Sequence, residues 1–309
     1  GQMIGAGVLD DVLRDGGDSY GIGEVSERLL TQRPEQLRLY MEGLAAGGSV
    51  QARAAAQAYN TAGDKEKGSH FTTLAKRFEL WLDKGVQEVS TGKGIDWQDI
   101  FTSGQPTTVF IQPPANLMDY YGAWARVVIG CALSEAQRIY RQKGEPLQQR
   151  VCFLIDEAWA LGQSARIENA IRTVRAANIQ IVMCFQSPSQ LKEIYNNAGS
   201  VQDSCDVWQI SGGEKNADLL KQASELVGDT TVKTSSENKS EAGSSESKSE
   251  AVRRLIKPEE IRGMDKYEQL VFVGSLVFKD KKPYWRRVKG LAAAVEKADV
   301  KALTKAAVA

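Results

Sequence analysis

The sequence predicts a mainly parallel, three-layer α/β domain preceded by a small all-α domain. Apolar, β-branched strands alternate with helix-length segments between residues 107 and 210, which is typical of parallel strands joined by crossover helices. The first 90 residues instead show apolar residues at helical spacing, with almost no strand-like alternation. At 309 residues and 42% apolar composition, the chain can bury one large core and a second, smaller one.

Composition argues against several broad classes of protein. Acidic and basic residues number 39 each, so no overall basic field draws the chain toward nucleic acid or anionic membranes. The four cysteines form no CxxC pair and there is one histidine, His70, which predicts buried thiols in a reducing cytoplasm and no metal site. No apolar run is long enough to cross a bilayer. Because the chain opens Gly1-Gln2-Met3, we expect a piece of a longer protein, with any anchor upstream.

The all-α domain is expected at residues 1–95. Two sets of apolar residues at helical spacing predict a helical hairpin and a further helix, and Pro34 suits a helix start. The hairpin set is Leu29, Leu30, Leu37, Tyr40, Met41 and Leu44, and the second set is Phe71, Leu74, Phe78, Trp81 and Leu82. The glycine-rich stretch 92–97 marks the junction with the next domain.

The α/β domain is expected at residues 96–290, followed by a weakly held helical tail at 291–309. The Ser-rich segment at about 230–250 has hardly an apolar side chain, so burial cannot offset its ordering entropy and we expect a mobile loop. Strands are predicted at 107–112, 151–155, 179–185, 206–210, 270–273 and 276–278, and helices from 117 to the basic stretch before Gly144, at 165–177, at 189–195 and from Pro258.

Two acids follow the buried strand 151–155. Asp156 and Glu157 come where the carboxyl end of a parallel strand delivers residues to the ligand-binding edge of a sheet. In nucleotide hydrolases the first such carboxylate holds magnesium through water, and the second deprotonates the attacking water. In the alternative interpretation, Asp156 caps the next helix and Glu157 is merely solvated.

Two further side chains are candidates for the same site. Gln186 follows the next strand, 179–185, where an amide can sense a γ-phosphate or hold the attacking water. Arg172 and Arg175 lie beside the apolar stripe of the intervening helix, and an arginine at a subunit boundary can stabilise transition-state charge on a neighbour's nucleotide. The alternatives are a turn amide before Pro188 and solvated helix arginines.

The order of these motifs resembles that of the type IV secretion coupling proteins, the VirD4-, TraG- and TraD-like ATPases of conjugation. The resemblance covers residues 97–288, and its most specific part is Gln186-Ser-Pro-Ser-Gln-Leu191. It rests on Phe153–Gly162, Ile167–Asn178, Cys184–Tyr195, Arg253–Arg262 and Val271–Gly274.

The resemblance implies a RecA-like P-loop NTPase fold and a motor that uses ATP and Mg²⁺ as a homo-hexameric ring. Such rings work at the cytoplasmic face of the inner membrane with other type IV secretion components, passing single-stranded DNA with its relaxase, or protein effectors, into a secretion channel. By the same resemblance Asp156 and Glu157 match the Walker B acids, Gln186 the sensor glutamine and Arg175 the arginine finger in trans.

A phosphate-binding loop, Gly-x-x-x-x-Gly-Lys-[Ser/Thr], is absent from the sequence. Gly92-Lys93-Gly94 follows no buried strand, and Gly212–Asn216 has the wrong spacing and Asn where Ser or Thr should bind magnesium. Three interpretations therefore stay open: the C-terminal portion of a translocase, a substrate-recruiting module that never hydrolyses ATP, or a VirB4-like secretion ATPase. The basic, aromatic stretch 279–289 suits either nucleic-acid contact or a solvated terminal strand.

Overall fold

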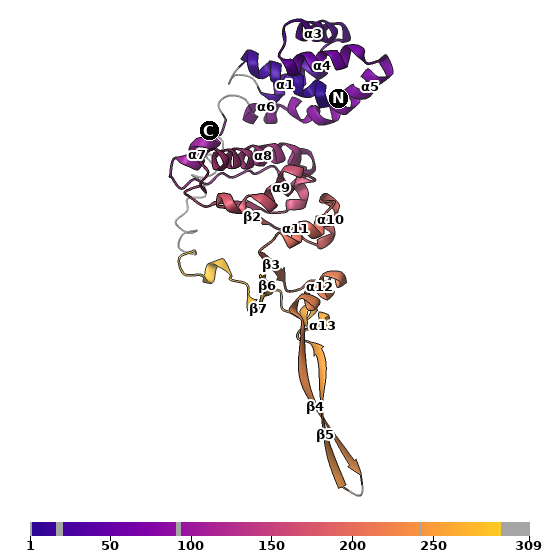
Figure 1. Ribbon diagram of the computed structural model, residues 1–309, viewed down its shortest axis with the longest axis vertical. Coiled ribbons are helices and arrows are strands. Elements are labelled where there is room, and N and C mark those ends of the chain that lie inside the picture. The colour runs from indigo at the N-terminus through magenta and orange to yellow at the C-terminus, as the bar shows by residue number, and fades with distance from the viewer. Residues whose placement is uncertain (1, 17–20, 91–93, 241–242, 292–309) are drawn as a thin grey trace. The chain divides into compact units, whose positions relative to one another are not determined.

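We describe the protein from a computed structural model, in which residues 2–16, 21–90, 94–240 and 243–291 are described. The chain divides into two compact units, Gly1–Asn197 and Ala198–Ala309, whose helices and strands are labelled in Figure 1. The predicted helical tail lies outside the described residues beyond Leu291, as do residues 91–93 of the predicted junction. Within the described residues, no helix combines the length and apolarity needed to span a membrane.

Six helices make up the N-terminal part of the first unit. The apolar faces of the first five meet in one core whose fully buried members include Ile4, Leu29, Met41 and Leu74, and Val86 of the sixth belongs to a separate cluster with Leu80 and Trp81. Pro34 occupies the first turn of its helix, as predicted, and the Ser49 hydroxyl caps the next helix by accepting from the amide of Ala52. The helices are α1 (Gln2–Gly16), α2 (Ile22–Leu30), α3 (Pro34–Gly47), α4 (Val50–Thr61), α5 (Asp64–Phe78) and α6 (Lys84–Ser90).

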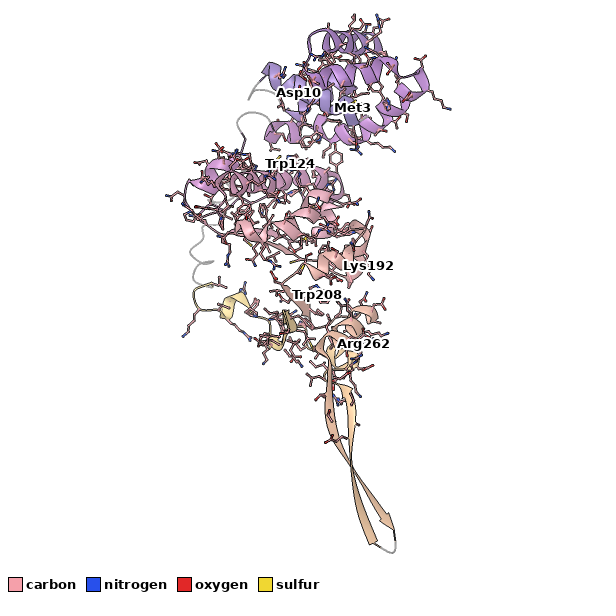
Figure 2. All side chains as sticks on the ribbon, in the orientation of Figure 1. Met3, Asp10, Trp124, Lys192, Trp208 and Arg262 are labelled. Carbon is pink, nitrogen blue, oxygen red and sulfur yellow. The ribbon has the colours of Figure 1, made fainter. Side chains whose placement is uncertain are left out.

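A long helix, α8 (Met118–Lys143), joins this helical part to the parallel strands. The indole of Trp124, which Figure 2 labels, donates to Ser90 Oγ at 3.2 Å, and its ring packs against the buried cluster that includes Trp81. Before α8 come a short helix, α7 (Trp97–Thr102), and an extended segment. The strand predicted at 107–112 is wrong for this structure, because that segment pairs with no neighbouring strand among the described residues.

Two parallel strands form the sheet of the first unit. β1 (Val151–Ile155) and β2 (Ile179–Met183) pair in register, Val151 with Ile179 and Ile155 with Met183. The connection is α9 (Ala165–Thr173), flanked by the short 3₁₀ turns η4 (Ala158–Leu161) and η5 (Arg175–Ala177). This strand–helix–strand unit is as predicted, since a crossover helix is what lets consecutive strands run parallel. In the described part of the chain each strand has one partner, so each leaves one edge unpaired.

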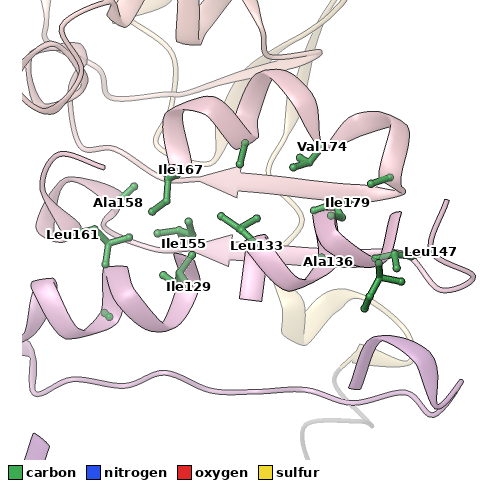
Figure 3. Packing of buried hydrophobic residues seen from close by; sticks show 14 residues of the cluster. Ile129, Leu133, Ala136, Leu147, Ile155, Ala158, Leu161, Ile167, Val174 and Ile179 are labelled. Atoms are coloured by element: carbon green, nitrogen blue, oxygen red, sulfur yellow. The ribbon is translucent and has the colours of Figure 1, made fainter. Parts of the chain in front are cut away.

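One face of this strand pair packs against α8 and α9. The cluster joins Ile129 and Leu133 of α8, Ile155 of β1 and Ile167 of α9 (Figure 3). Fully burying each such side chain contributes roughly 1.5–3 kcal/mol to stability. Because Ile155 is the last residue of β1 and belongs to this core, the core holds the end of β1 in place.

The opposite face of the pair is open. Leu154 is 70% exposed, and Cys152, Gln180 and Cys184 are also exposed. The prediction of buried thiols is therefore wrong for all four cysteines, Cys131 and Cys205 included. Successive strand residues point to opposite faces, and Cys152 and Cys184 point to the face that α8 and α9 leave uncovered.

The second unit is built on an antiparallel sheet. β3 (Val207–Ser211) pairs antiparallel with β6 (Glu268–Val273), which pairs antiparallel with β7 (Leu276–Lys281). The expectation that strand 206–210 continues a parallel series is wrong, because its partner comes from late in the chain. The helices of this unit are α11 (Ala198–Asp203), α12 (Ala217–Val227) and α13 (Pro258–Arg262), and the core includes Leu220, Ile261 and Leu270.

A long hairpin occupies the place of the predicted mobile loop. β4 (Asp229–Ser240) and β5 (Gly243–Arg254) pair antiparallel from Asp229–Arg254 to Ser240–Gly243. Low apolar content argued against burial, but a two-stranded ladder satisfies its backbone groups without a core. An ion pair between Arg254 and Asp229, 3.0 Å long, lies at its base.

Candidate active site at the carboxyl edge of the parallel strands

The two predicted acids follow β1 directly. Asp156 and Glu157 are exposed, and Asp156 Oδ1 accepts from the Glu157 amide at 3.0 Å. Backbone hydrogen bonds on either side of them bind this loop to the strand end: Cys184 donates to the Ile155 carbonyl at 3.0 Å, and Ala158 donates to the Cys184 carbonyl at 3.0 Å. The acids are thus held between two cross-strand bonds.

Glu157 has a left-handed backbone, with φ 47° and ψ 50°. This conformation is uncommon for a residue with a Cβ and costs of order 1 kcal/mol. The turn it makes starts η4, where the Ala160 amide donates to the Glu157 carbonyl at 2.8 Å. Among the described residues, Asn178 is the other non-glycine residue with positive φ. Local strain is thus placed at one of the two acids, as at many functional sites.

Gln186 lies three residues past the end of β2, at the same edge as the two acids. Its side chain is exposed, and its backbone amide donates to Gln190 Oε1 at 2.9 Å. Gln190 belongs to the first turn of α10 (Pro188–Ile194), which Ser187 precedes. The positioning role of Gln190 was not foreseen, although Ser-x-x-Gln is a recognisable capping pattern that marks it.

Trp159 ties the loop after β1 to the helix after β2. Its indole nitrogen donates to Glu193 Oε2 at 2.9 Å, which joins η4 to α10. Neither residue was a candidate in the sequence, although Trp159 stands two positions after Glu157. The contact makes the two site-bearing loops one connected structure.

Helix α8 supports the same loop from behind. A Cβ on Gly122 would lie 2.6 Å from the Ala160 carbonyl oxygen, so only glycine lets α8 approach η4 this closely. The half-buried Arg126 guanidinium donates to the Leu161 carbonyl, and burial lowers the pKa of Arg126. The orientation of η4 therefore depends on a backbone approach that no local pattern reveals.

Arg175 lies at the other end of β2. It is exposed and begins η5, four residues before β2 starts, whereas Asp156, Glu157 and Gln186 follow the strand ends. A five-residue strand separates the two edges, a distance of roughly 16 Å. The chain's own fold thus brings the two acids and Gln186 to one edge and leaves Arg175 at the opposite one.

Metal chemistry fits this edge of the first unit, whereas phosphate chemistry does not fit the glycine-containing turn after β3 in the second unit. Exposed carboxylates and an amide are hard oxygen donors of the kind Mg²⁺ prefers, although no group of three His, Cys, Asp or Glu side chains suited to a metal occurs among the described residues. The Gly212–Asn216 turn does not fit a phosphate, because Glu214 Oε1 already accepts from the amides of Lys215 and Asn216 at 2.7 and 2.6 Å.

Tyr195, at the C-terminus of α10, gives this region a pH-dependent stability. Burial first, and then the Glu168 carboxylate, raise the pKa of its phenol to about 12, from an ordinary value near 10. The neutral, buried phenol contributes its full stabilisation of the folded state below about pH 10. This stabilisation is lost as the pH rises through about 12. Relative to Tyr195→Phe, the wild type should lose up to about 1.4 kcal/mol of unfolding free energy per pH unit in that window. Urea midpoints of both proteins at pH 9 and 11 measure this, and an unchanged difference would contradict it.

A family model named "Type IV secretory system Conjugative DNA transfer" matches residues 24–306, most of the chain. The chain belongs to this conjugative DNA transfer family. It is 31% identical over 152 residues to the conjugal transfer protein TraG of Agrobacterium fabrum, covering 48% of this chain and 22% of TraG. It is 28% identical over 171 residues to the type IV secretion system-coupling protein VirD4 of Bartonella quintana, covering 54% of this chain and 26% of VirD4.

Solved structures of a plasmid coupling protein share the fold. TrwB in complex with the non-hydrolysable ATP analogue ADPNP matches with a TM-score of 0.66 and 18% identity, over 91% of this chain and 62% of TrwB. TrwB in complex with ADP and Mg²⁺ matches with a TM-score of 0.63 and 18% identity, over 92% of this chain and 64% of TrwB. The family member described here thus has the RecA-type α/β fold of TrwB. The alignments span about a quarter of TraG and VirD4 and under two thirds of TrwB.

Proposed function

We propose that this chain is the C-terminal portion of a coupling ATPase of type IV secretion. In this role it uses ATP hydrolysis to drive single-stranded DNA with its relaxase, or a protein effector, into the secretion channel. The observation that carries the proposal is the shared edge of β1 and β2, where Asp156, Glu157 and Gln186 follow parallel, in-register strands. The match over residues 24–306 and the TrwB fold support it.

Each residue of the edge has a distinct task in this proposal. Bound ATP and Mg²⁺ supply the transferable phosphoryl group and the neutralising charge. Asp156 would hold a hydrated Mg²⁺ through its second carboxylate oxygen, since Oδ1 already accepts from the Glu157 amide. Glu157 accepts the proton of the attacking water, and Gln186 orients that water and contacts the γ-phosphate. The phosphate-binding loop comes from a segment outside this chain.

Arg175 acts on a neighbouring subunit in this proposal. Its place at the far edge of β2 keeps it from the acids of its own chain, and its exposed position suits a contact in trans. A guanidinium supplied this way stabilises transition-state charge. The corresponding assembly is a homo-hexameric ring at the cytoplasmic face of the inner membrane, in contact with other secretion components.

The proposal is tested on the gene product that carries this chain together with a phosphate-binding loop. We expect ATP hydrolysis that single-stranded DNA stimulates, measured as phosphate release. Arg175→Ala should lower kcat by about 10³-fold or more. Mixing it with a variant lacking the phosphate-binding lysine should restore activity at least tenfold over either parent, because mixed interfaces combine one intact arginine with one intact loop.

The outcomes separate the remaining alternatives. If the protein hydrolyses no ATP but captures a secretion substrate without nucleotide, the recruiting module is favoured. The absence of a phosphate-binding loop from this sequence also supports that alternative. If the wild type hydrolyses ATP but no mixture of the two inactive variants does, Arg175 does not act in trans.

A further inference from the structure

An arginine-rich cleft runs along α8 on a side of the first unit that the catalytic edge does not use. Its volume is about 1070 Å³, and its lining includes the small residues Gly130 and Ser134 of α8. Residues of α5, α7 and the segment that leads into α9 complete its walls. The arginines that line it are Arg77, Arg126, Arg138, Arg141 and Arg166.

The positive charge of the cleft exceeds what its own acids neutralise. Five arginines face two carboxylates, Asp96 and Glu135. Glu135 is engaged by Arg138 in an ion pair, and Asp96 Oδ1 accepts from the Asp99 amide at 2.9 Å as the cap of α7. Both acids are therefore already used within the protein.

Three of the arginines form no ion pair with a carboxylate among the described residues. Arg126 donates to a backbone carbonyl, Arg166 donates to the Ser134 hydroxyl, and Arg141 is exposed. Of the three, Arg126 is half-buried, whereas Arg141 and Arg166 are exposed. Partly removing the Arg126 guanidinium from water without a counter-charge is unfavourable, so an anionic ligand would supply a charge that the protein does not.

Apolar and aromatic groups open into the same cleft. Ile95 is 43% exposed and Val127 is 38% exposed. The half-buried Trp97 lines the cleft and stacks on Phe101, with ring centroids 6.0 Å apart and an interplanar angle of 21°. A ligand that suits the cleft therefore combines negative charge with flat apolar surface.

We propose that this cleft binds single-stranded nucleic acid. Phosphates would pair with Arg126, Arg141 and Arg166, whose planar forks suit phosphate oxygens. Unpaired bases would lie against the indole and the aliphatic side chains, as in other single-strand grooves. A duplex hides its base faces and an acidic peptide has none, so neither uses both features. The choice of DNA rests on the proposed function, whereas the binding itself requires no hydrolysis.

Binding of the full 309-residue chain to a fluorescent oligothymidine tests the proposal, measured by anisotropy at several salt concentrations. Arg141→Gln/Arg166→Gln should weaken binding about tenfold and reduce the slope of log K against log salt by about 1.4, since two phosphate contacts are lost. The control Arg38→Gln/Arg150→Gln removes the same charge from two exposed sites outside the cleft and should change binding less than twofold. Thermal melts of all three proteins should agree.

Four results would overturn the proposal: no binding by the wild type at low salt, equal weakening by the control pair, equal affinity for a duplex of the same length, or displacement by poly-glutamate at a lower charge concentration than by oligothymidine. Because the assay contains no ATP, its failure leaves the catalytic proposal intact. Conversely, an inactive ATPase that still binds oligothymidine through these arginines would count against the catalytic proposal alone.

Discussion

Glu157→Gln will lower the kcat of ATP hydrolysis by about a thousandfold in the gene product that carries a phosphate-binding loop, while nucleotide affinity stays within about threefold of the wild type. The substitution keeps the size of the side chain but removes its ability to accept a proton, and such a loss costs roughly 10²–10⁴ in rate. Phosphate release measures turnover, and a fluorescent nucleotide measures binding. Binding should persist because the proposed Mg²⁺ ligand, Asp156, is unchanged.

Glu145→Gln is the matched control for this prediction. Glu145 is an exposed residue in the loop before β1, outside the edge that carries Asp156. The control removes one negative charge without touching the site, so its kcat should equal that of the wild type. If Glu157→Gln retains full turnover, Glu157 is not the base. If both variants fall equally, the effect is one of net charge.

Gly212→Ala will destabilise the antiparallel sheet of the second unit by about 3 kcal/mol or more, because an overpacked site with rigid neighbours must shift backbone. The added Cβ would clash with the Asp265 carbonyl oxygen and would lie 2.9 Å from its carbonyl carbon. At the same position the Gly212 amide donates to the Glu268 carbonyl at 2.8 Å. Relieving the clash therefore breaks the end of the β3–β6 ladder.

Hydrogen exchange of peptides from β3 and β6 measures this effect within the second unit. Protection in both strands should drop together, while peptides from β1 and β2 stay as in the wild type. Gly199→Ala is the control, because its added Cβ meets nothing within 4 Å in α11 and Ala is favoured over Gly in a helix by up to about 1 kcal/mol. Equal protection in the Gly212 and Gly199 variants would contradict the packing argument.

The parallel strand pair and its acids could be predicted because local pattern carries them. A five-residue apolar strand, a helix and a second apolar strand specify β1, α9 and β2, and the acid pair follows β1 without a gap. The place of Gln186 at the same edge then follows from the parallel direction alone. The roles given to these residues remain proposals, as do the domain limits at 95 and 290.

The remaining features depend on contacts between segments far apart in the chain. The partner of β3 is β6, some 60 residues later, and nothing in the alternating pattern near 207 indicates that antiparallel direction. The extended segment 107–112 has strand-like residues, but a strand also needs a neighbour to pair with. The hydrogen bond from Trp159 to Glu193 and the approach of Gly122 to η4 likewise arise only when separate elements pack together.

The arginines of α8 show an intermediate case. At 100° per residue, Arg126, Arg138 and Arg141 fall within an arc of about 120° around the helix axis, which places them along one side of the helix. Their sequence alone is equally compatible with a solvated surface. The neighbouring α7, with Asp96 used as its cap, is what turns that side into a cleft.

The open edges of β1 and β2 have a practical consequence for anyone handling this chain. Among the residues that the structure describes, the amides and carbonyls along one edge of each strand are unpaired, and Leu154 of β1 is exposed. Such an edge is a template on which a second molecule can add its own strands. The fraction of protein lost to aggregation should therefore depend on the protein concentration more strongly than on temperature. Work at a lower protein concentration, rather than a change of buffer, is the remedy that addresses this cause.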